Sequence, residues 1–488
     1  MYDVIVIGND LSSIVAATLI SHSGKKTALL SEGDCKHVYS DYGYTFNIDP
    51  LPLTGFGPSQ VCSSLLDEVG ILFPEGPGLE QLNPGLQIVL TDHRIDCPSS
   101  LKELLVDMKR EFPAEARDIA KLYTSILKIG EIVEEQINPR RNITRSSLAN
   151  GLSFVNRLSA IIKERFFLSR KFKSITANPS IARVLEAQKA VLSNSAGPNN
   201  GTISVGAAYA LSLPLKGMFH HVCGNEKLIE LLRTSFSASG GQLIDNCSIM
   251  RLAVSSKVVD VDFSTPDALS SIQGRYLITT TKWEKLRLLL ADNRKFKRVE
   301  RRFRSVKTAY YPFTLHMGVL EKGLPEKIAT YVAVVIDKNR PVMDDNLVLL
   351  EVSAKNCEAR APAGRRALSA TVFLRESPLT LTNDELKEIS QIIFCALERF
   401  LPFIRENLDF LNIGISIELS RKSQELVNKK YTMLSRPLLG IGGLSNRTPL
   451  RNVLLTGGML EAELGFQGEI MTGINAANSV IAKEKNNA

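Results

Sequence analysis

Two short apolar runs near the start of the chain flank a stretch with helical spacing. The runs cover residues 3–7 and 26–30, and between them apolar side chains recur every three or four positions from Leu11 to Ser23. This order predicts a strand, a helix and a second strand, with a turn at residues 8–10. Gly24 is typical of a helix C-cap. The pattern therefore predicts a βαβ unit.

Further along, the patterns change from helical to strand-like and then return to an arrangement like the first unit. Helical spacing predicts helices over 113–136, 153–192 (broken near Asn178-Pro179), 225–237 and 384–400, and a final helix that ends near Ala482. Apolar runs and alternation predict strands at 242–244, 259–263, 275–279, 308–319, 331–336, 347–352, 369–373 and 452–456.

Strands that return to an earlier unit imply interleaved domains, and 488 residues are too many for one hydrophobic core. The predicted fold class is α/β. A Rossmann-type domain that binds FAD or NAD(P) is interleaved with an α+β substrate or partner domain that contains an antiparallel sheet. We assign 1–75, 205–290 and 440–488 to the dinucleotide-binding domain. Residues 76–204 and 291–439 form the second domain.

Composition indicates a soluble cytoplasmic protein. Hydrophobic residues make up 44% and charged residues 23% of the chain, which is ordinary for a globular protein. No run reaches the ~18 apolar residues of a spanning helix, and no basic signal-peptide region precedes the first strand. The seven cysteines are scattered and odd in number, which favours reduced thiols over a disulfide framework.

The net charge of +8 is concentrated in two basic segments. Glu164 is the single acid from Arg140 to Lys173, and Glu300 is the single acid from Arg294 to Lys307. Basic clusters attract phosphates of nucleic acids, membranes or ligands. Because no helix-turn-helix, zinc-finger or RNA-binding motif accompanies them, no nucleic-acid partner is expected.

The turn after the first predicted strand keeps part of a dinucleotide-binding motif. In G-x-G-x-x-G the glycines allow the turn, the approach of the pyrophosphate and close helix packing. Gly8 is present, but Asp10 and Ser13 occupy the second and third positions. Glu32 ends the second strand, where a carboxylate would bind ribose. The predicted cofactor contacts here are Gly8, Asp10, Leu11, Ser12 and Glu32.

Asp10 has two interpretations. A carboxylate about 5 Å from one phosphate charge costs roughly 3 kcal/mol at an effective dielectric of about 20, which would weaken binding more than a hundredfold unless the side chain turned away. Alternatively, Asp10 or Asn9 is the helix N-cap. The carboxylate would then occupy the anion site that a phosphate normally fills, and the cofactor would be displaced or absent.

A second glycine-rich run follows the last predicted strand. Glycines let a helix N-terminus approach a phosphate or a flavin ring without side-chain obstruction. Close helix packing would explain Gly473 alone, but hardly the earlier glycines together. The predicted cofactor contacts in this run are Gly457, Gly458, Gly465, Phe466, Gln467 and Gly468.

On these motifs the chain resembles the FAD-dependent amine oxidase and phytoene desaturase superfamily. The resemblance also rests on Gly43-Tyr44-Thr45-Phe46-Asn47-Ile48-Asp49-Pro50, on Cys223-Gly224 and on Gly240-Gly241, in the family's segment order. The family's arginine and paired glycines after the ribose acid are here Cys35-Lys36-His37-Val38. Gly458 stands where an acid usually faces the ribityl chain, so the resemblance implies the fold but not retained flavin.

Two functions are compatible with this resemblance. The first is an FAD-dependent oxidoreductase, of desaturase or dehydrogenase type, that acts on an apolar, isoprenoid or polyene substrate. The second is a flavin-free lipid-binding or assembly protein, because the superfamily includes Rab GDP-dissociation inhibitors, which look similar in fold and bind prenyl lipids. The sequence nominates no catalytic acid or base. The group His220-His221-x-Cys223 has no partner cluster at a metal-binding spacing, so no metal is expected.

The basic segment Ser153–Lys173 mixes bulky apolar residues with arginines and lysines. Such a helix can lie in a lipid interface, which predicts peripheral association with an anionic membrane. The alternative is a helix that packs on its own domain.

Overall fold

The computed structural model describes residues 1–33, 36–71, 78–137, 164, 168–197, 203–280, 285, 286, 289, 306–343, 345–433 and 444–485. Cys35, most of Ser153–Lys173 and all of the second basic segment except Val306 and Lys307 lie outside the described residues. None of the described helices is long and apolar enough to cross a membrane.

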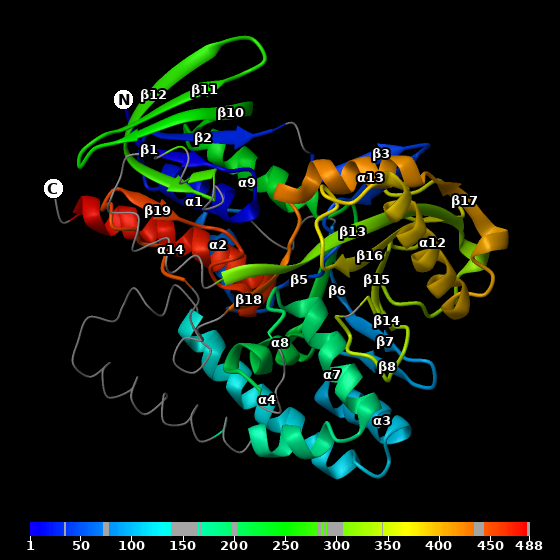
Figure 1. Cartoon of the computed structure of the whole chain (residues 1–488). Helices are drawn as coiled ribbons and strands as arrows, with labels where there is room; N and C mark the ends of the chain where they lie inside the picture. Colours follow the sequence, from blue (N-terminus) through cyan, green and yellow to red (C-terminus); the bar gives the residue numbers. More distant parts are fainter. Residues whose placement is uncertain are drawn as a thin grey trace.

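A mostly parallel sheet carries the opening and closing segments of the chain (Figure 1). β1 (Tyr2–Ile7) lies between β2 (Thr27–Glu32) and β12 (Leu269–Thr279) and is parallel to both. β10 (Gln242–Val254) extends the sheet beyond β2, and β19 (Val453–Leu455) extends it beyond β12, again in parallel. β11 (Val259–Ser264) joins β10 and β12 in an antiparallel meander. The predicted α/β Rossmann-type fold is confirmed.

Both faces of this sheet are buried because β1 is apolar at every position from Val4 to Ile7. Val4 and Val6 belong to the core beneath three helices, whereas Ile5 and Ile7 face a second core. The helices are α1 (Leu11–His22), α9 (Glu226–Ala238) and α14 (Gly465–Lys485). In Figure 1, α14 lies beside α1, although the two helices come from opposite ends of the described chain.

An eight-stranded sheet forms the second predicted unit, and its strand order is β17-β13-β16-β15-β14-β7-β8, with β18 paired to β13. All its pairings are antiparallel except β14 with β7. The strands are β7 (Leu86–Val89), β8 (Arg94–Cys97), β13 (Val306–Leu320), β14 (Tyr331–Val335), β15 (Leu347–Val352), β16 (Arg365–Leu374), β17 (Leu408–Leu411) and β18 (Lys430–Met433). The predicted antiparallel sheet is confirmed, while the exact domain boundaries stay a prediction.

Helices and two small sheets complete the described structure. The small sheets contain β3 (Val38–Asp41) with β4 (Tyr44–Asn47), and β5 (Leu53–Thr54) with β9 (Met218–His221) and β6 (Leu79–Leu82). The remaining α-helices are α2 (Val61–Glu68), α3 (Leu101–Glu111), α4 (Ala116–Ile137), α7 (Pro179–Leu192), α8 (Val205–Lys216), α12 (Asn383–Phe400) and α13 (Ile413–Lys422).

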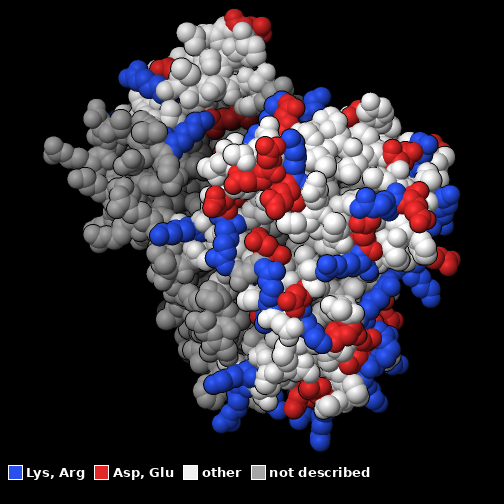
Figure 2. Space-filling view, turned by 45° about the vertical axis from the view of Figure 1, so that its right-hand side comes forward, with Lys and Arg blue, Asp and Glu red and all other residues white. Residues whose placement is uncertain are grey.

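The surface charges are mixed on the face drawn in Figure 2. Acidic and basic side chains are interspersed over the described part of this face. The net charge of +8 is therefore not gathered into one basic field there.

Candidate functional site

Asp10 is the N-cap of α1, as one of the two sequence interpretations predicts. Its backbone is extended (φ −83°, ψ 165°), and its Oδ1 accepts a hydrogen bond from Ser13 N at 3.2 Å. Two hydroxyls add to this: Ser13 Oγ donates to Oδ1 at 2.6 Å and Ser12 Oγ donates to Oδ2 at 2.9 Å. The carboxylate is thus held at the helix end, where the macrodipole favours negative charge.

A second carboxylate, that of Glu469, reaches the same helix end from α14. This carboxyl group is buried, with the residue only 7% exposed, and the nearby backbone of Ser12 acts to lower its pKa. First-turn N–H groups are the donors that hold a pyrophosphate in dinucleotide-binding folds. Here the Ser13 N–H donates to Asp10, and the carboxyl group of Glu469 lies beside the Ser12 backbone.

A buried polar network continues from Glu469 into the neighbouring loops. The side chain of Asn428, just before β18, lies beside Glu469 and acts to lower the pKa of its carboxyl group. The Asn428 Nδ2 donates to Asp49 Oδ2 at 2.7 Å, and its Oδ1 accepts from Asn194 Nδ2 at 2.9 Å. The network therefore joins α1 and α14 to the loops after β4 and α7.

Lys430 is the buried cation beside this network. Its Nζ donates to Ser193 O at 2.8 Å and lies 4.8 Å from the centroid of the Phe373 ring, and the residue is 1% exposed. Burial lowers the Lys430 pKa to about 7, although the negative charge of Asp49 opposes the shift. The amine is therefore close to its midpoint at neutral pH.

The carboxyl groups of the network hold protons more tightly than exposed acids do. Burial, with the neighbouring charges of Asp10 and Asp49, raises the Glu469 pKa to about 8. Burial also raises the Asp49 pKa to about 6, against hydrogen bonds from Asn428. The Asp10 pKa is raised too, because burial outweighs the hydrogen bonds from Ser13 and Ser12. At neutral pH the three carboxyl groups therefore retain protons between them and do not carry three full negative charges.

Gly457 and Gly458, which the sequence predicts to contact a cofactor, lie beside this network. A Cβ on Gly457 would lie 3.8 Å from Asp10 Oδ2, and one on Gly458 would lie 3.2 Å from Asn428 Oδ1. The N–H of Gly457, however, already donates to Thr472 Oγ1 at 3.1 Å. It is therefore not available to a ligand in this conformation.

The other predicted residues of the closing run lie in packing positions. A Cβ on Gly465 would come within 2.2 Å of Leu192 O, and one on Gly468 within 2.3 Å of Glu461 O. Phe466 packs near Phe56, and the Gln467 Oε1 accepts from Tyr209 OH at 2.7 Å. Close packing within the chain accounts for these glycines.

Gly8 and Leu11 flank the helix end. Gly8 has a φ of +146°, and a Cβ there would lie 2.2 Å from Thr280 Oγ1, so only glycine fits without rearrangement. Leu11 is the first residue of α1 and is buried. Close packing against α1, expected of the motif's third glycine, involves Gly473 of α14 instead, where a Cβ would lie 2.4 Å from Ser12 O.

Glu32, the predicted ribose ligand, forms an ion pair with Lys285. The carboxylate does end β2, as the sequence indicates, and its side chain is 22% exposed. The lysine therefore competes with a ribose hydroxyl for the same oxygen.

The residues at the helix end do not fit the pyrophosphate of FAD. A phosphate there would have to displace the Asp10 carboxyl group from the Ser13 N–H and would then lie beside the carboxyl groups of Asp10 and Glu469. The sequence signals Asp10, but Glu469, Asn428 and Lys430 were missed. Glu469 directly follows Gly468, and an acid inside a glycine-rich run was the one available signal.

No protein-family model and no curated protein matches the chain. Solved structures do match along almost the whole length. An oxidoreductase from Methanosarcina mazei is 12% identical, with a TM-score of 0.62 over 98% of this chain and 100% of that chain. Putrescine oxidase bound to putrescine is 14% identical, with a TM-score of 0.57 over 99% of both chains. Rab GDI from Plasmodium falciparum is 11% identical, with a TM-score of 0.51 over 99% of this chain and 98% of that chain.

These similarities confirm the predicted resemblance at the level of the fold. The chain has the fold shared by amine oxidases and Rab GDI. At identities of 11–14% the shared fold leaves the activity to be argued from the site itself.

Proposed function

We propose that this chain is a flavin-free binding protein on the amine-oxidase fold, with an apolar, isoprenoid-type lipid as its ligand. The observation that carries the first half is the Asp10 carboxyl group, which accepts a hydrogen bond from Ser13 N–H at the helix end, together with the buried Glu469 carboxyl group beside the Ser12 backbone. A pyrophosphate would need the N–H donors of this helix end.

Electrostatics supports the same conclusion. The Asp10 carboxylate is held at the helix end by three hydrogen bonds, so it cannot turn away without losing the cap. A phosphate about 5 Å away would lose roughly 3 kcal/mol to this charge at an effective dielectric of about 20. The charge of Asp10 therefore favours a flavin-free function over that of an FAD-dependent oxidoreductase.

The lipid half of the proposal rests on the fold and on the sequence resemblance. Both functions expected from the sequence share an apolar ligand, and the Rab GDI fold supports a lipid-binding function without flavin chemistry. Loss of the cofactor would leave the ligand-binding domain in place. Function would then lie in binding or delivery rather than in oxidation.

The first experiment measures FAD binding by absorbance and calorimetry with the full chain. We expect no binding to the wild type and a gain of binding in the double variant Asp10→Gly/Glu469→Ala, which removes both carboxyl groups from the helix end. The matched control is Asn412→Gly/Glu418→Ala, which removes a similar cap and an exposed acid from α13. Flavin that co-purifies with the wild type near stoichiometry would overturn the flavin-free function.

The second experiment tests the lipid. Vesicles that contain a fluorescent farnesylated peptide are mixed with the protein, and the peptide that passes into the vesicle-free supernatant is measured. We expect extraction of the farnesylated peptide and none of the same peptide without the farnesyl group. Equal extraction of both peptides, or of neither, would reject an isoprenoid ligand while leaving the flavin result intact.

A further inference from the structure

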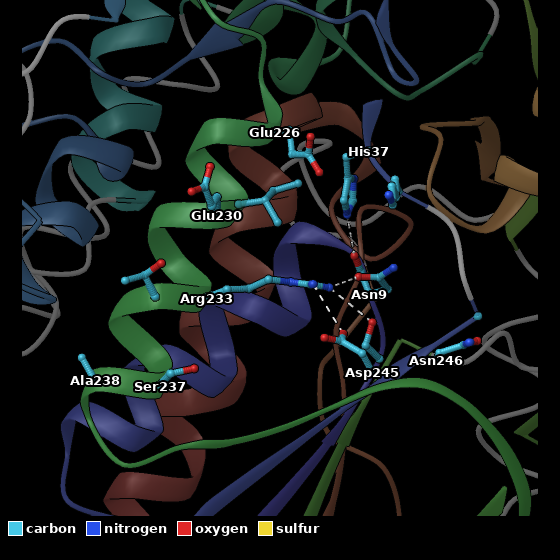
Figure 3. A pocket seen from close by; sticks show the side chains of 14 residues that line it. Asn9, His37, Glu226, Glu230, Arg233, Ser237, Ala238, Asp245 and Asn246 are labelled. Carbon is cyan, nitrogen blue, oxygen red and sulfur yellow. Dashed lines mark hydrogen bonds and ion pairs between the residues drawn. The ribbon is translucent and has the colours of Figure 1, made fainter. Parts of the chain in front are cut away.

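A pocket of about 720 Å³ opens beside α9, at the carboxyl ends of β1 and β2 and beside the first half of β10 (Figure 3). Asn9 follows β1, Ser31 and Gly33 lie at the end of β2, and Asp245 lies within β10. In open α/β sheets, ligands bind outside the carboxyl ends of the strands. The pocket has the size of a small-molecule site, and Glu32 is not among its lining residues.

Arg233 extends from α9 across the floor of this pocket (Figure 3). Its Nη2 donates to Asn9 Oδ1 and, at 3.3 Å, to Ser31 Oγ, while Nη1 lies 3.4 Å from Asp245 Oδ1. The buried Nε has no hydrogen-bond partner. The guanidinium is thus fixed in place by three contacts, while its side chain stays 25% exposed, and because a guanidinium carries five N–H donors, further donors are left for a ligand.

The strand beside Arg233 departs from regular geometry. The register between β10 and β2 shifts between Ile244 and Cys247, and Asn246 has a φ of +51°. Bulges of this kind reorient side chains next to binding sites. Here the irregular stretch contains Asp245, whose carboxylate reaches the arginine.

Among the described residues that line the pocket, carboxylates outnumber cations. Lys36 and Arg233 are opposed by Glu226, Glu230 and Asp245. His37 adds no charge at neutral pH, because burial and the charge of Arg233 lower its pKa to about 4. A phosphate-bearing ligand would meet a net negative surrounding, which disfavours it. Figure 3 shows Glu226 at the side of the pocket where His37 lies.

We propose that this pocket binds a small zwitterion of the α-amino-acid class, with its carboxylate on Arg233 and its ammonium group near Glu226. The guanidinium supplies directed donors for a carboxylate, and the surplus of acids favours the ammonium group. Partial burial raises the pKa of Glu226, and the neighbouring Glu230 adds to the shift. An incoming ammonium ion would stabilise the charged form of this acid.

Each of the amino acids found in proteins is added separately to the full chain, and binding is screened by the shift in unfolding temperature. The affinity of the best binder is then measured by calorimetry. Arg233→Gln should weaken that binder about tenfold or more, because a hydrogen bond to a charged group is lost. Glu226→Gln should weaken it as well, and it removes no hydrogen bond that holds the fold. Arg251→Gln is the matched control, since Arg251 lies on β10 with its side chain 71% exposed.

Two outcomes would overturn the proposal. One is the absence of binding by every amino acid. The other is tighter binding of 5′-AMP that falls in Arg233→Gln but not in Glu226→Gln, which would assign the pocket to a phosphate. Because neither arm involves Asp10 or Glu469, the result is independent of the flavin test.

Discussion

The backbone of Ser12, in the first turn of α1, lies beside the carboxyl group of Glu469 on α14 and acts to lower the pKa that burial raises. The two residues come from the opening and the closing motif of the sequence. The positive end of a helix dipole thus stabilises an acid of the chain.

Glu469 should make the protein less stable as the pH rises. Its pKa is raised from 4.5 in the unfolded reference to about 8 in the folded protein. The folded state therefore retains a proton that the unfolded state releases, and the free energy of unfolding falls between about pH 4.5 and pH 8. Glu469→Gln cannot titrate, so its unfolding midpoint should fall less over this window.

The comparison isolates Glu469 because the other shifted groups are present in both proteins. Asp49 acts in the same direction up to its pKa of about 6. Lys430, whose pKa is lowered to about 7, acts in the opposite direction above that pH. Wild-type and variant midpoints that decline in parallel would contradict the role of Glu469.

Removal of the α1 cap should lower stability and also move the titration of Glu469. We expect Asp10→Ala to cost about 0.5–2 kcal/mol by urea unfolding. Asp10→Asn should cost less, because the amide oxygen can still accept from Ser13. Both variants remove a negative charge that raises the Glu469 pKa, so the decline of stability should end at a lower pH than in the wild type.

A matched cap elsewhere separates these two effects. Thr382 caps α12 with its side chain, so Thr382→Ala should cost a similar free energy without moving the pH profile. An Asp10→Asn variant whose stability depends on pH as the wild type's does would show that the charge of Asp10 does not affect the pKa of Glu469.

Gly473→Ala should destabilise the contact between α14 and α1. The added Cβ would lie 2.4 Å from Ser12 O, and overpacking of this kind costs about 1–3 kcal/mol. Gly414→Ala in α13 is the control, since its nearest neighbour would be 3.5 Å away. Alanine favours helix by about 1 kcal/mol, so the control should gain stability. A similar gain in Gly473→Ala would mean that the helices tolerate the methyl group.

Membrane association of Ser153–Lys173 stays a proposal. The described C-terminal end of this segment favours the alternative, in which the segment packs on its own domain. Leu168 and Phe172 are buried, and Lys171 Nζ lies 2.8 Å from Asp118 Oδ1. If the remaining basic residues face a bilayer, each contributes roughly 1 kcal/mol on an anionic surface. Vesicle co-sedimentation should then show binding that weakens at high salt.

Reversal of Arg165, Arg170 and Lys171 to glutamate should abolish this binding. The control reverses three basic residues of α12 and α13, namely Lys387, Arg399 and Lys422. Loss of binding in the control alone, or no binding of the wild type to either anionic or neutral vesicles, would assign the segment to its own domain.

Local patterns were sufficient to predict the elements around the site. The apolar run before Gly8 is β1, and Asp10 in the following turn is the N-cap of α1, as predicted. Both features depend on residues that are neighbours in the sequence. The strand β10 was predicted at 242–244 but extends to Val254. Its exposed meander with β11 lacks the apolar run that marked its start.

Contacts between distant segments could not be predicted in this way. Asn428 meets Asp49, and Arg233 meets Asn9, across separations that no periodicity encodes. The glycines at 465 and 468 illustrate the same limit, because a glycine needed for a ligand and one needed for a neighbouring carbonyl look alike in a sequence. Only the fold distinguishes them.

The pairing of the closing segment with the opening one also sets an order of events during synthesis. α1 is buried at every position from Leu11 to Ser21, and α14 supplies much of its cover. During synthesis on the ribosome, the apolar surface of α1 stays uncovered until α14, near the end of the described chain, has been made. Such a nascent chain exposes hydrophobic surface for tens of seconds at ordinary elongation rates of about 5–20 residues per second, and it is a natural client for chaperones.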